Sequence, residues 1–176
     1  ALTARLTDNI AYPYLLLLVS GGHTQLLSVL GPGHYERLGT TMDDAAGEVF
    51  DKGAAVLGLG YPGGPAIEAA AKTGDASAVR LPHPRKGKPD CHFSFSGLKT
   101  AVAQRWAQAV AAGNENVNDF AASLQQAITV SLCDRVKQAL VRFAESQNER
   151  RLVIAGGVAA NQQIGAALKT LADEHG

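Results

Sequence analysis

One stretch decides the fold of this chain: LLLLVSGGHTQLLSVL, residues 15–30. The continuous apolar run at residues 15–19 is bounded by turn residues, which is typical of a strand that is buried on both of its faces. After the glycine pair, residues 23–30 resume as a second strand. A strand, a tight glycine turn and another strand together predict a β-hairpin.

Outward from the hairpin, the hydrophobic pattern predicts a mixed α/β chain. Asp43 or Asp44 can cap one helix and Ser96 another. The longest helix carries an apolar stripe, at steps of three and four residues, over about six turns. We expect a third strand at 35–39, helices at 43–57, 65–74 and 97–111, a long helix after residue 118, a strand at 152–155 and a last helix from about 161.

The composition is that of a globular protein. Of the 176 residues, 46% are hydrophobic and 18% are charged, which fits one core with a helical insertion at roughly residues 75–150. The 16 basic and 16 acidic side chains cancel, so any contact with nucleic acid has to be local. Cys91 and Cys133 are far apart, which argues against a disulfide scaffold and fits a reducing cytosol. No apolar run approaches the roughly 18 to 20 residues that span a bilayer, and no signal peptide is recognisable.

Two predicted strands end in a glycine pair, Gly21-Gly22 and Gly156-Gly157. Glycine leaves backbone N–H groups unobstructed, so each junction can form a nest for phosphate or for the edge of a nucleotide. The second pair precedes a helix start, whose free N–H groups favour anions. A third pair, Gly63-Gly64, precedes a helix that starts at Pro65. The alternative is that each pair only makes a tight turn, and both interpretations stay open.

Three acidic residues, Asp44, Glu48 and Asp51, fall on one face of the helix predicted at 43–57. Like charges at this spacing repel, so the helix gains nothing from placing them together. Such a face can hold ribose hydroxyls, a metal ion or a lysine such as Lys52. The alternative, which the sequence slightly favours, is a solvated acidic face near a helix N-terminus.

Other features also have two interpretations. His23 can reach a bound phosphate or be structural. The string FSFSGLKT, residues 93–100, suits an anionic ligand, or needs only a Ser96 cap with Phe95 as a hydrophobic staple. Cys91-His92 has no second ligand pair at a useful spacing for a metal. A basic run can contact a phosphate backbone but is more simply a solvated loop; it comprises Arg80, His83, Arg85, Lys86, Lys88, His92 and Lys99.

Four strings together resemble one family. They are LLVSGGHTQLLSV (17–29), DDAAGEVFDKGAAVLGLGYPGGP (43–65), FSFSGLKT (93–100) and LVIAGGVAANQQI (152–164). In this order and spacing they resemble the TsaD family of tRNA threonylcarbamoyl-adenosine transferases, formerly labelled O-sialoglycoprotein endopeptidases or glycoproteases. The resemblance covers nearly the whole chain, which is similar to the central and C-terminal part of such a protein.

The resemblance implies one lobe of an actin-like ATPase, or ribonuclease H-like, fold with a mixed sheet flanked by helices. The implied activity is transfer of a threonylcarbamoyl group from threonylcarbamoyl-adenylate to the adenosine next to the anticodon in tRNA. Carried over by position, one backbone loop would contact the acyl-phosphate: Leu18, Val19, Ser20, Gly21 and Gly22. The nucleoside would be held by Asp51 and Gly64, with Glu48 near the ribose, and Asn161, after Gly156 and Gly157, would complete the pocket.

The resemblance also implies ATP or threonylcarbamoyl-adenylate as ligand, tRNA as substrate, TsaB-type and TsaE-type partner proteins, a cytoplasmic location, and neither membrane nor DNA. The family binds one metal ion, iron or zinc, through ligands that would fall before residue 1 and beyond residue 176. The first lobe would also lie outside the chain, so we expect this chain alone to be inactive. The alternatives are a metal-dependent glycoprotein endopeptidase, a sugar-kinase-like phosphotransferase and a non-enzymatic partner-binding lobe, and fold alone does not separate them.

Overall fold

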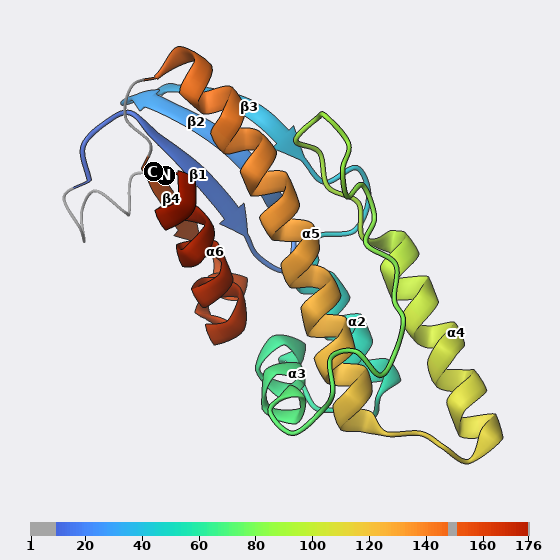
Figure 1. Cartoon of the computed structure of the whole chain (residues 1–176). Coiled ribbons are helices and arrows are strands. Elements are labelled where there is room, and N and C mark those ends of the chain that lie inside the picture. The colour runs from blue at the N-terminus through green and yellow to red at the C-terminus, as the bar shows by residue number, and fades with distance from the viewer. Residues whose placement is uncertain (1–9, 148–150, 176) are drawn as a thin grey trace.

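The computed structural model of the chain describes residues 10–147 and 151–175. Four strands form one mixed sheet in the order β3-β2-β1-β4 (Figure 1). β1 pairs antiparallel with β2 and parallel with β4, and β2 pairs antiparallel with β3. The predicted mixed sheet, built on the hairpin, is therefore confirmed. Its strands are β1 (Tyr14–Val19), β2 (Thr24–Gly31), β3 (His34–Thr40) and β4 (Leu152–Ala155).

β1 has a neighbouring strand on each side and is buried on both faces. Because successive side chains of a strand point to opposite faces, Leu15, Leu17 and Val19 join the main core. Tyr14 and Leu16 join a smaller cluster with residues of β2 and β4. A strand in this position has no place for a polar side chain, which explains the continuous apolar run.

Two helices cover one face of the sheet and three stand beyond its end. α5 (Val117–Ser146) and α6 (Gln162–His175) lie over the sheet, and a short 3₁₀ turn, η1 (Gly157–Ala160), joins β4 to α6 (Figure 1). Beyond the end to which β1 points lie α2 (Ala46–Val56), α3 (Gly63–Ala71) and α4 (Ser96–Ala112). Within the described residues, no helix is both long enough and apolar enough to cross a membrane.

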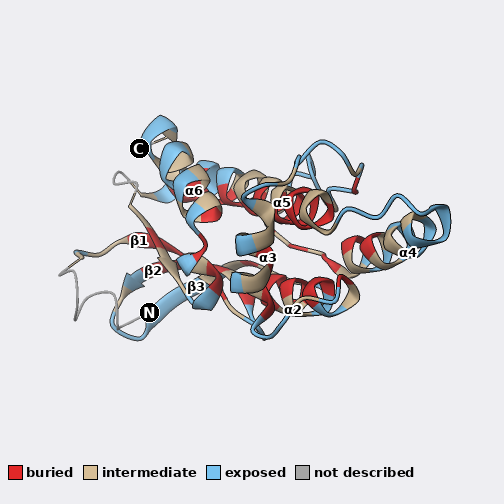
Figure 2. Ribbon diagram, turned by 90° about the horizontal axis from the view of Figure 1, so that it is seen from below, coloured by how far each residue is buried: buried red, intermediate tan, exposed pale blue. Residues whose placement is uncertain are grey.

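α5 is the helix that contributes most to the main core. Every position of the apolar stripe predicted for the longest helix is buried, as expected for a helix that packs along the whole of one side. Figure 2 shows these buried positions on α5, in contrast to the exposed outer end of α4. The buried stripe consists of Phe120, Leu124, Ala127, Ile128, Leu132, Val136, Leu140 and Phe143.

The starts of two helices differ from the prediction. α2 begins at Ala46 without a side-chain cap, so neither Asp43 nor Asp44 caps it. α4 begins at Ser96 itself, which therefore is not its cap either. Instead, the hydroxyl and the backbone N–H of Ser96 both donate to the carboxylate of Asp43. Capping preferences depend on residues that are close in the sequence. Ser96 and Asp43 are 53 positions apart in the sequence, so capping preferences could not predict this hydrogen bond.

The irregular segment between α3 and α4 is anchored to α5 by a buried arginine. Arg135 is only 1% exposed, and its guanidinium donates to the carboxylate of Asp134 and the backbone carbonyl of Asp90. Asp134 also accepts a hydrogen bond from the backbone N–H of Gly87 at 3.1 Å. A buried charge has to be paired in this way. Of the predicted basic run, Arg85 is itself paired with Asp90.

Candidate functional site

A cavity of about 330 Å³ opens beyond the carboxyl ends of the parallel strands β1 and β4. In open α/β sheets, ligands bind at this edge. Four parts of the chain form its walls: the β1–β2 turn, α2, the first half of α3 with the loop before it, and η1 with the residue that follows it. The lining residues are Gly21, Gly47, Phe50, Asp51, Tyr61, Pro62, Gly64, Pro65, Glu68, Gly157, Val158, Ala160 and Asn161.

Close contact between backbones holds the β1–β2 turn against the other walls. The N–H of Gly47 donates to the carbonyl of Ser20 at 3.1 Å, and a Cβ on Gly47 would lie 2.5 Å from that same oxygen. A Cβ on Gly156 would collide with the carbonyl oxygen of Val19, and its φ of 108° is one that other residues rarely adopt. Both positions therefore require glycine for structural reasons.

The two carboxylates in the lining tie the walls together. Asp51 Oδ1 accepts a hydrogen bond from the N–H of Gly63, at the start of α3, at 2.8 Å. Glu68 Oε1 accepts one from the N–H of Gln162, at the start of α6, at 2.7 Å. Each carboxylate thus lies at a helix N-terminus, where a negative charge is favourable.

A different set of glycines keeps the cavity open. Gly21, Gly64 and Gly157 all line it, and a Cβ at any of the three would meet no atom within 4 Å. A side chain at these positions would therefore meet no packed neighbour, and none of the three has to be glycine for packing. Glycines of this kind mark places where a ligand approaches the backbone.

Asn161 lines the cavity, is buried, and has its amide fixed by neighbours. Its Oδ1 accepts from the N–H of Ile164 at 3.0 Å, and its Nδ2 donates to Gln125 Oε1 at 2.7 Å. Gln125, also buried, donates through Nε2 to Gln163 Oε1 at 2.6 Å. Buried amides that satisfy one another in this way set each other's orientation. Asn161 can meet a ligand through the second N–H of Nδ2 or the second lone pair of Oδ1.

The electrostatics of the cavity do not favour a phosphate inside it. Among the described residues, its lining holds two carboxylates, Asp51 and Glu68, and no lysine or arginine. The N–H groups predicted to be free at the start of the last helix are in part engaged, since Gln162 and Ile164 donate to protein side chains. The cavity therefore suits a neutral polar group, such as a nucleoside, better than an anion.

Over residues 1–176, the chain matches the family described as TsaD, tRNA N6-adenosine threonylcarbamoyltransferase. The chain belongs to the TsaD family. Relatives with the name tRNA N6-adenosine threonylcarbamoyltransferase are 55% identical over 179 residues in Brucella suis, 54% over 179 in Brucella anthropi and 53% over 180 in Agrobacterium fabrum. These alignments cover 100% of this chain and 50%, 50% and 49% of the three relatives. The chain thus spans about half the length of the curated relatives it matches.

The architecture is consistent with the actin-like fold of the TsaD family, since a mixed sheet is flanked by helices. Of the site residues predicted from the TsaD resemblance, five line one cavity: Gly21, Asp51, Gly64, Gly157 and Asn161.

Five more of the predicted residues form the wall behind the cavity or its rim. Leu18 pairs with a residue of β4, and Val19 is fully buried against Gly156. The hydroxyl of Ser20 accepts from the N–H of His23 at 3.2 Å, and Gly22 lies exposed in the same turn.

Glu48 is the predicted TsaD site residue that lies apart from the others. It is near Lys99, whose pKa is raised first by its hydrogen bond to Asp44 and to a smaller extent by the charge of Glu48. Asp44 precedes α2 instead of lying in it. The acidic face predicted for this helix is therefore divided: Asp51 lines the cavity, and the other two acids lie toward α4.

Sequence analysis did not single out several residues of the lining. All but Glu68 lie inside the four strings that resemble the TsaD family, but choosing among the members of a string requires knowing which residues line the cavity. These residues are Gly47, Phe50, Tyr61, Pro62, Pro65, Glu68, Val158 and Ala160.

Three consecutive residues of the string FSFSGLKT, Ser94 to Ser96, donate hydrogen bonds to the carboxylate of Asp43. Asp43 accepts from the hydroxyls of Ser94 at 2.6 Å and Ser96 at 2.9 Å, and from the N–H of Phe95 at 2.7 Å. Burial opposes ionisation of Asp43, but these hydrogen bonds outweigh it and hold the pKa of the carboxyl below its ordinary value. The serines therefore fasten α4 to the start of α2, and their hydroxyls are engaged within the protein.

Within the part of the chain that the structure describes, no group of three or more His, Cys, Asp or Glu side chains is arranged to hold a metal ion.

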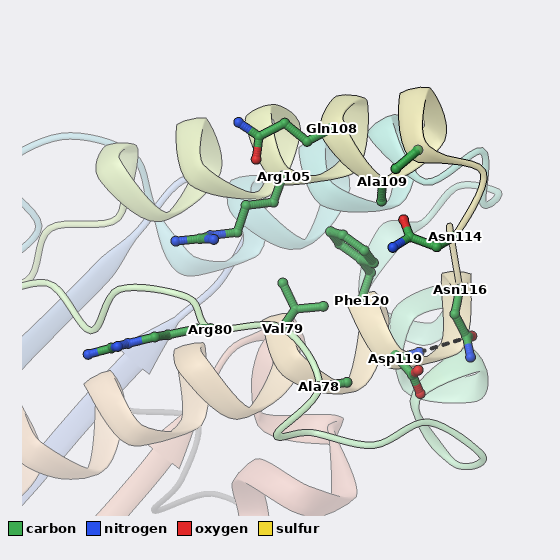
Figure 3. A pocket seen from close by; sticks show the side chains of 11 residues that line it. Ala78, Val79, Arg80, Arg105, Gln108, Ala109, Asn114, Asn116, Asp119 and Phe120 are labelled. Atoms are coloured by element: carbon green, nitrogen blue, oxygen red, sulfur yellow. Dashed lines mark hydrogen bonds between the residues drawn. The ribbon is translucent and has the colours of Figure 1, made fainter.

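A second cavity, of about 430 Å³, lies between α4, α5 and the segment before α4 (Figure 3). Arg80 and Arg105 extend along one end of it, and Asn116 and Asp119 lie at the other. Its lining includes Phe120, which packs edge-on against the ring of Trp106 at 5.0 Å. Because the residues predicted for the TsaD site line the first cavity and not this one, we take the first as the candidate site.

Proposed function

We propose that the protein to which this chain belongs transfers a threonylcarbamoyl group from threonylcarbamoyl-adenylate to the adenosine next to the anticodon in tRNA, and that the cavity beside β1 and β4 holds the nucleoside of the adenylate. One observation carries the proposal. Gly21, Asp51, Gly64, Gly157 and Asn161, which the TsaD resemblance implies as site residues, come from separate parts of the chain and line the same cavity. The name shared by the relatives supports the reaction class.

The walls suggest how the adenylate is bound. We assign Asp51 and Glu68, the two carboxylates of the lining, to the ribose hydroxyls, with Glu68 in preference to Glu48, which lies outside the lining. We also assign the amide of Asn161 to a hydrogen bond with the nucleoside, and Gly64 to the wall beside which the nucleoside lies.

The acyl-phosphate is assigned to the rim formed by the backbone of Leu18 to Gly22 and of Gly156 and Gly157. Leu18 and Val19 are paired in β1 and the N–H of Ser20 donates to the carbonyl of His23, so we assign the contact with the anion to the N–H groups of the glycines. In the transfer, the amine of adenosine forms a bond to the carbamoyl carbon while the bond from that carbon to the phosphate oxygen breaks, so that AMP leaves with the bonding electron pair and the amine nitrogen loses one proton. Backbone N–H groups aimed at the carbonyl oxygen would stabilise the negative charge that develops on it.

Further parts of the proposal concern the whole protein. We propose that ATP or threonylcarbamoyl-adenylate is the nucleotide, that TsaB-type and TsaE-type proteins are partners, that one iron or zinc ion is bound outside this chain, and that the protein acts in the cytoplasm. This chain would supply one lobe, with residues 75–150 as a helical insertion. It would be inactive alone, because the adenylate would lie between two lobes.

The alternative activities gain less support from the site. A phosphotransferase of the sugar-kinase type has to neutralise transferring phosphate, and the described lining of the cavity contains no lysine or arginine. No feature of the cavity favours the glycoprotein endopeptidase.

A thermal-shift series with AMP and ATP tests the site, and incubation with tRNA, threonine, bicarbonate, ATP and the partner proteins tests the activity. We expect both nucleotides to raise the melting temperature of this chain, and no modified adenosine to form until the full-length protein replaces it. Absence of any nucleotide stabilisation would refute the nucleotide site. Modified adenosine formed by this chain would refute its inactivity, and cleavage of casein would favour the endopeptidase.

A further inference from the structure

Tyr61 is a large aromatic side chain that the protein leaves in solvent at the mouth of the cavity. It lines the cavity and is 87% exposed. By contrast, the rings of Tyr12 and Tyr14 stack on each other at 5.6 Å. Burying an aromatic ring stabilises a fold substantially, so a tyrosine held almost fully outside contributes little to the stability of this chain. Because it is exposed and lines the cavity, the side chain is accessible to a ligand that binds there.

The backbone around Tyr61 is held in place. Pro62 follows it directly, and proline restricts the backbone of both itself and the residue before it. Gly63 is then bonded to Asp51 at 2.8 Å, which ties the segment to α2. A ring on such a support loses less conformational freedom when it binds a ligand than one on a mobile loop does.

The chemistry of the other lining residues indicates which class of ligand would contact such a ring. Phe50, Val158 and Ala160 are the apolar members of the lining, with the Phe50 side chain itself buried, and the carboxylates of Asp51 and Glu68 provide hydrogen-bond acceptors. Apolar residues beside acceptors for hydroxyl groups fit a base attached to a sugar. A phosphate would instead face two negative charges.

We propose that Tyr61 is the stacking platform for the purine base of the nucleoside that occupies this cavity. The inference rests on the proposed function and names a residue of that site which the family motifs did not single out. Stacking between an aromatic side chain and a base tolerates different bases, because every base has a π face. Specificity for adenine would then come from polar neighbours such as Asn161.

The test compares three variants of this chain: Tyr61→Ala, Tyr61→Phe and, as a matched control, Tyr35→Ala. Tyr35 is also an exposed tyrosine, at 65%, but it lies on β3 and not in the cavity. Binding of AMP, of ribose 5-phosphate and of a short single-stranded RNA containing adenosine is measured by calorimetry. Proton NMR follows the adenine H2 and H8 signals, which a stacked ring shifts upfield.

We expect Tyr61→Ala to weaken AMP binding about tenfold to a hundredfold, the range typical of a lost base–aromatic stack. Ribose 5-phosphate, which has no base, should bind this variant as it binds the unchanged chain. Tyr61→Phe and Tyr35→Ala should retain AMP binding and the upfield shifts. A loss that appears with the RNA and not with AMP would assign the platform to a base of the RNA.

Two results would overturn the stacking role. One is unchanged affinity of Tyr61→Ala for both AMP and the RNA. The other is an equal loss of affinity for AMP and for ribose 5-phosphate, because a stack acts only on the base. If the unchanged chain binds neither AMP nor the RNA, the proposed nucleotide site itself is wrong, which is a separate outcome.

Discussion

Two glycines of the cavity region differ in what a methyl group would meet, and this difference makes a quantitative prediction. A Cβ on Gly47 would lie 2.5 Å from the carbonyl oxygen of Ser20 and 2.7 Å from the backbone N of Gly21. A Cβ on Gly64 would meet nothing within 4 Å. Both glycines lie in the first turn of a helix. Gly47→Ala and Gly64→Ala are therefore a matched pair.

The cost of Gly47→Ala can be estimated from its neighbours. Forcing an atom into packed backbone costs about 1–3 kcal/mol, and loss of the Gly47-to-Ser20 hydrogen bond adds about 1 kcal/mol. The higher helix propensity of alanine returns at most about 1 kcal/mol. The free energy of unfolding should fall by about 1–3 kcal/mol, which lowers the melting temperature by about 2 to 12 °C for a chain of this size.

Gly64→Ala should behave in the opposite way. The helix gains up to about 1 kcal/mol from alanine, so the melting temperature should stay the same or rise slightly. The methyl group would stand in the cavity, and one misplaced methyl group weakens ligand binding by about tenfold or more. Melting curves measured with and without AMP separate the two effects.

Two results would contradict these predictions. One is a fall in the free energy of unfolding of Gly64→Ala as large as that of Gly47→Ala, since open space cannot produce such a loss. The other is a melting temperature of Gly47→Ala equal to that of the unchanged chain. Retained AMP affinity in Gly64→Ala would show that the ligand does not approach this wall.

Three further predictions follow from single side chains. Asp43→Asn should lower stability at neutral pH. Because the folded pKa of Asp43 lies below its ordinary value, the deficit should begin to shrink as pH falls below about 3.9 and vanish once pH has fallen through the lower folded pKa, as urea titrations at several pH values would show. Gln125→Leu removes the partner of the Asn161 amide and should cost about 1–3 kcal/mol in urea unfolding and weaken AMP binding. Phe120→Ala, which removes a buried ring packed on Trp106, should cost about 3–5 kcal/mol without changing AMP affinity per folded molecule.

The elements of the fold could be predicted because their signals lie within short windows. The apolar run of β1 and the long stripe of α5 report burial directly, since only a strand or helix covered by other parts of the chain is that apolar. The glycine pairs marked where backbone has to approach backbone or ligand. The sequence by itself therefore determined the sheet, its covering helix and the family.

The sequence could not decide which of several equivalent residues faces the cavity. Asp44, Glu48 and Asp51 share one periodicity, yet only Asp51 lines the cavity. Asp44 lies before α2 and pairs with Lys99 of α4, and the charge of Glu48 also acts on Lys99. The exposure of Tyr61 is equally invisible in its motif. Such choices depend on contacts between residues far apart in the chain, and only tertiary packing, which sets those distances, decides them.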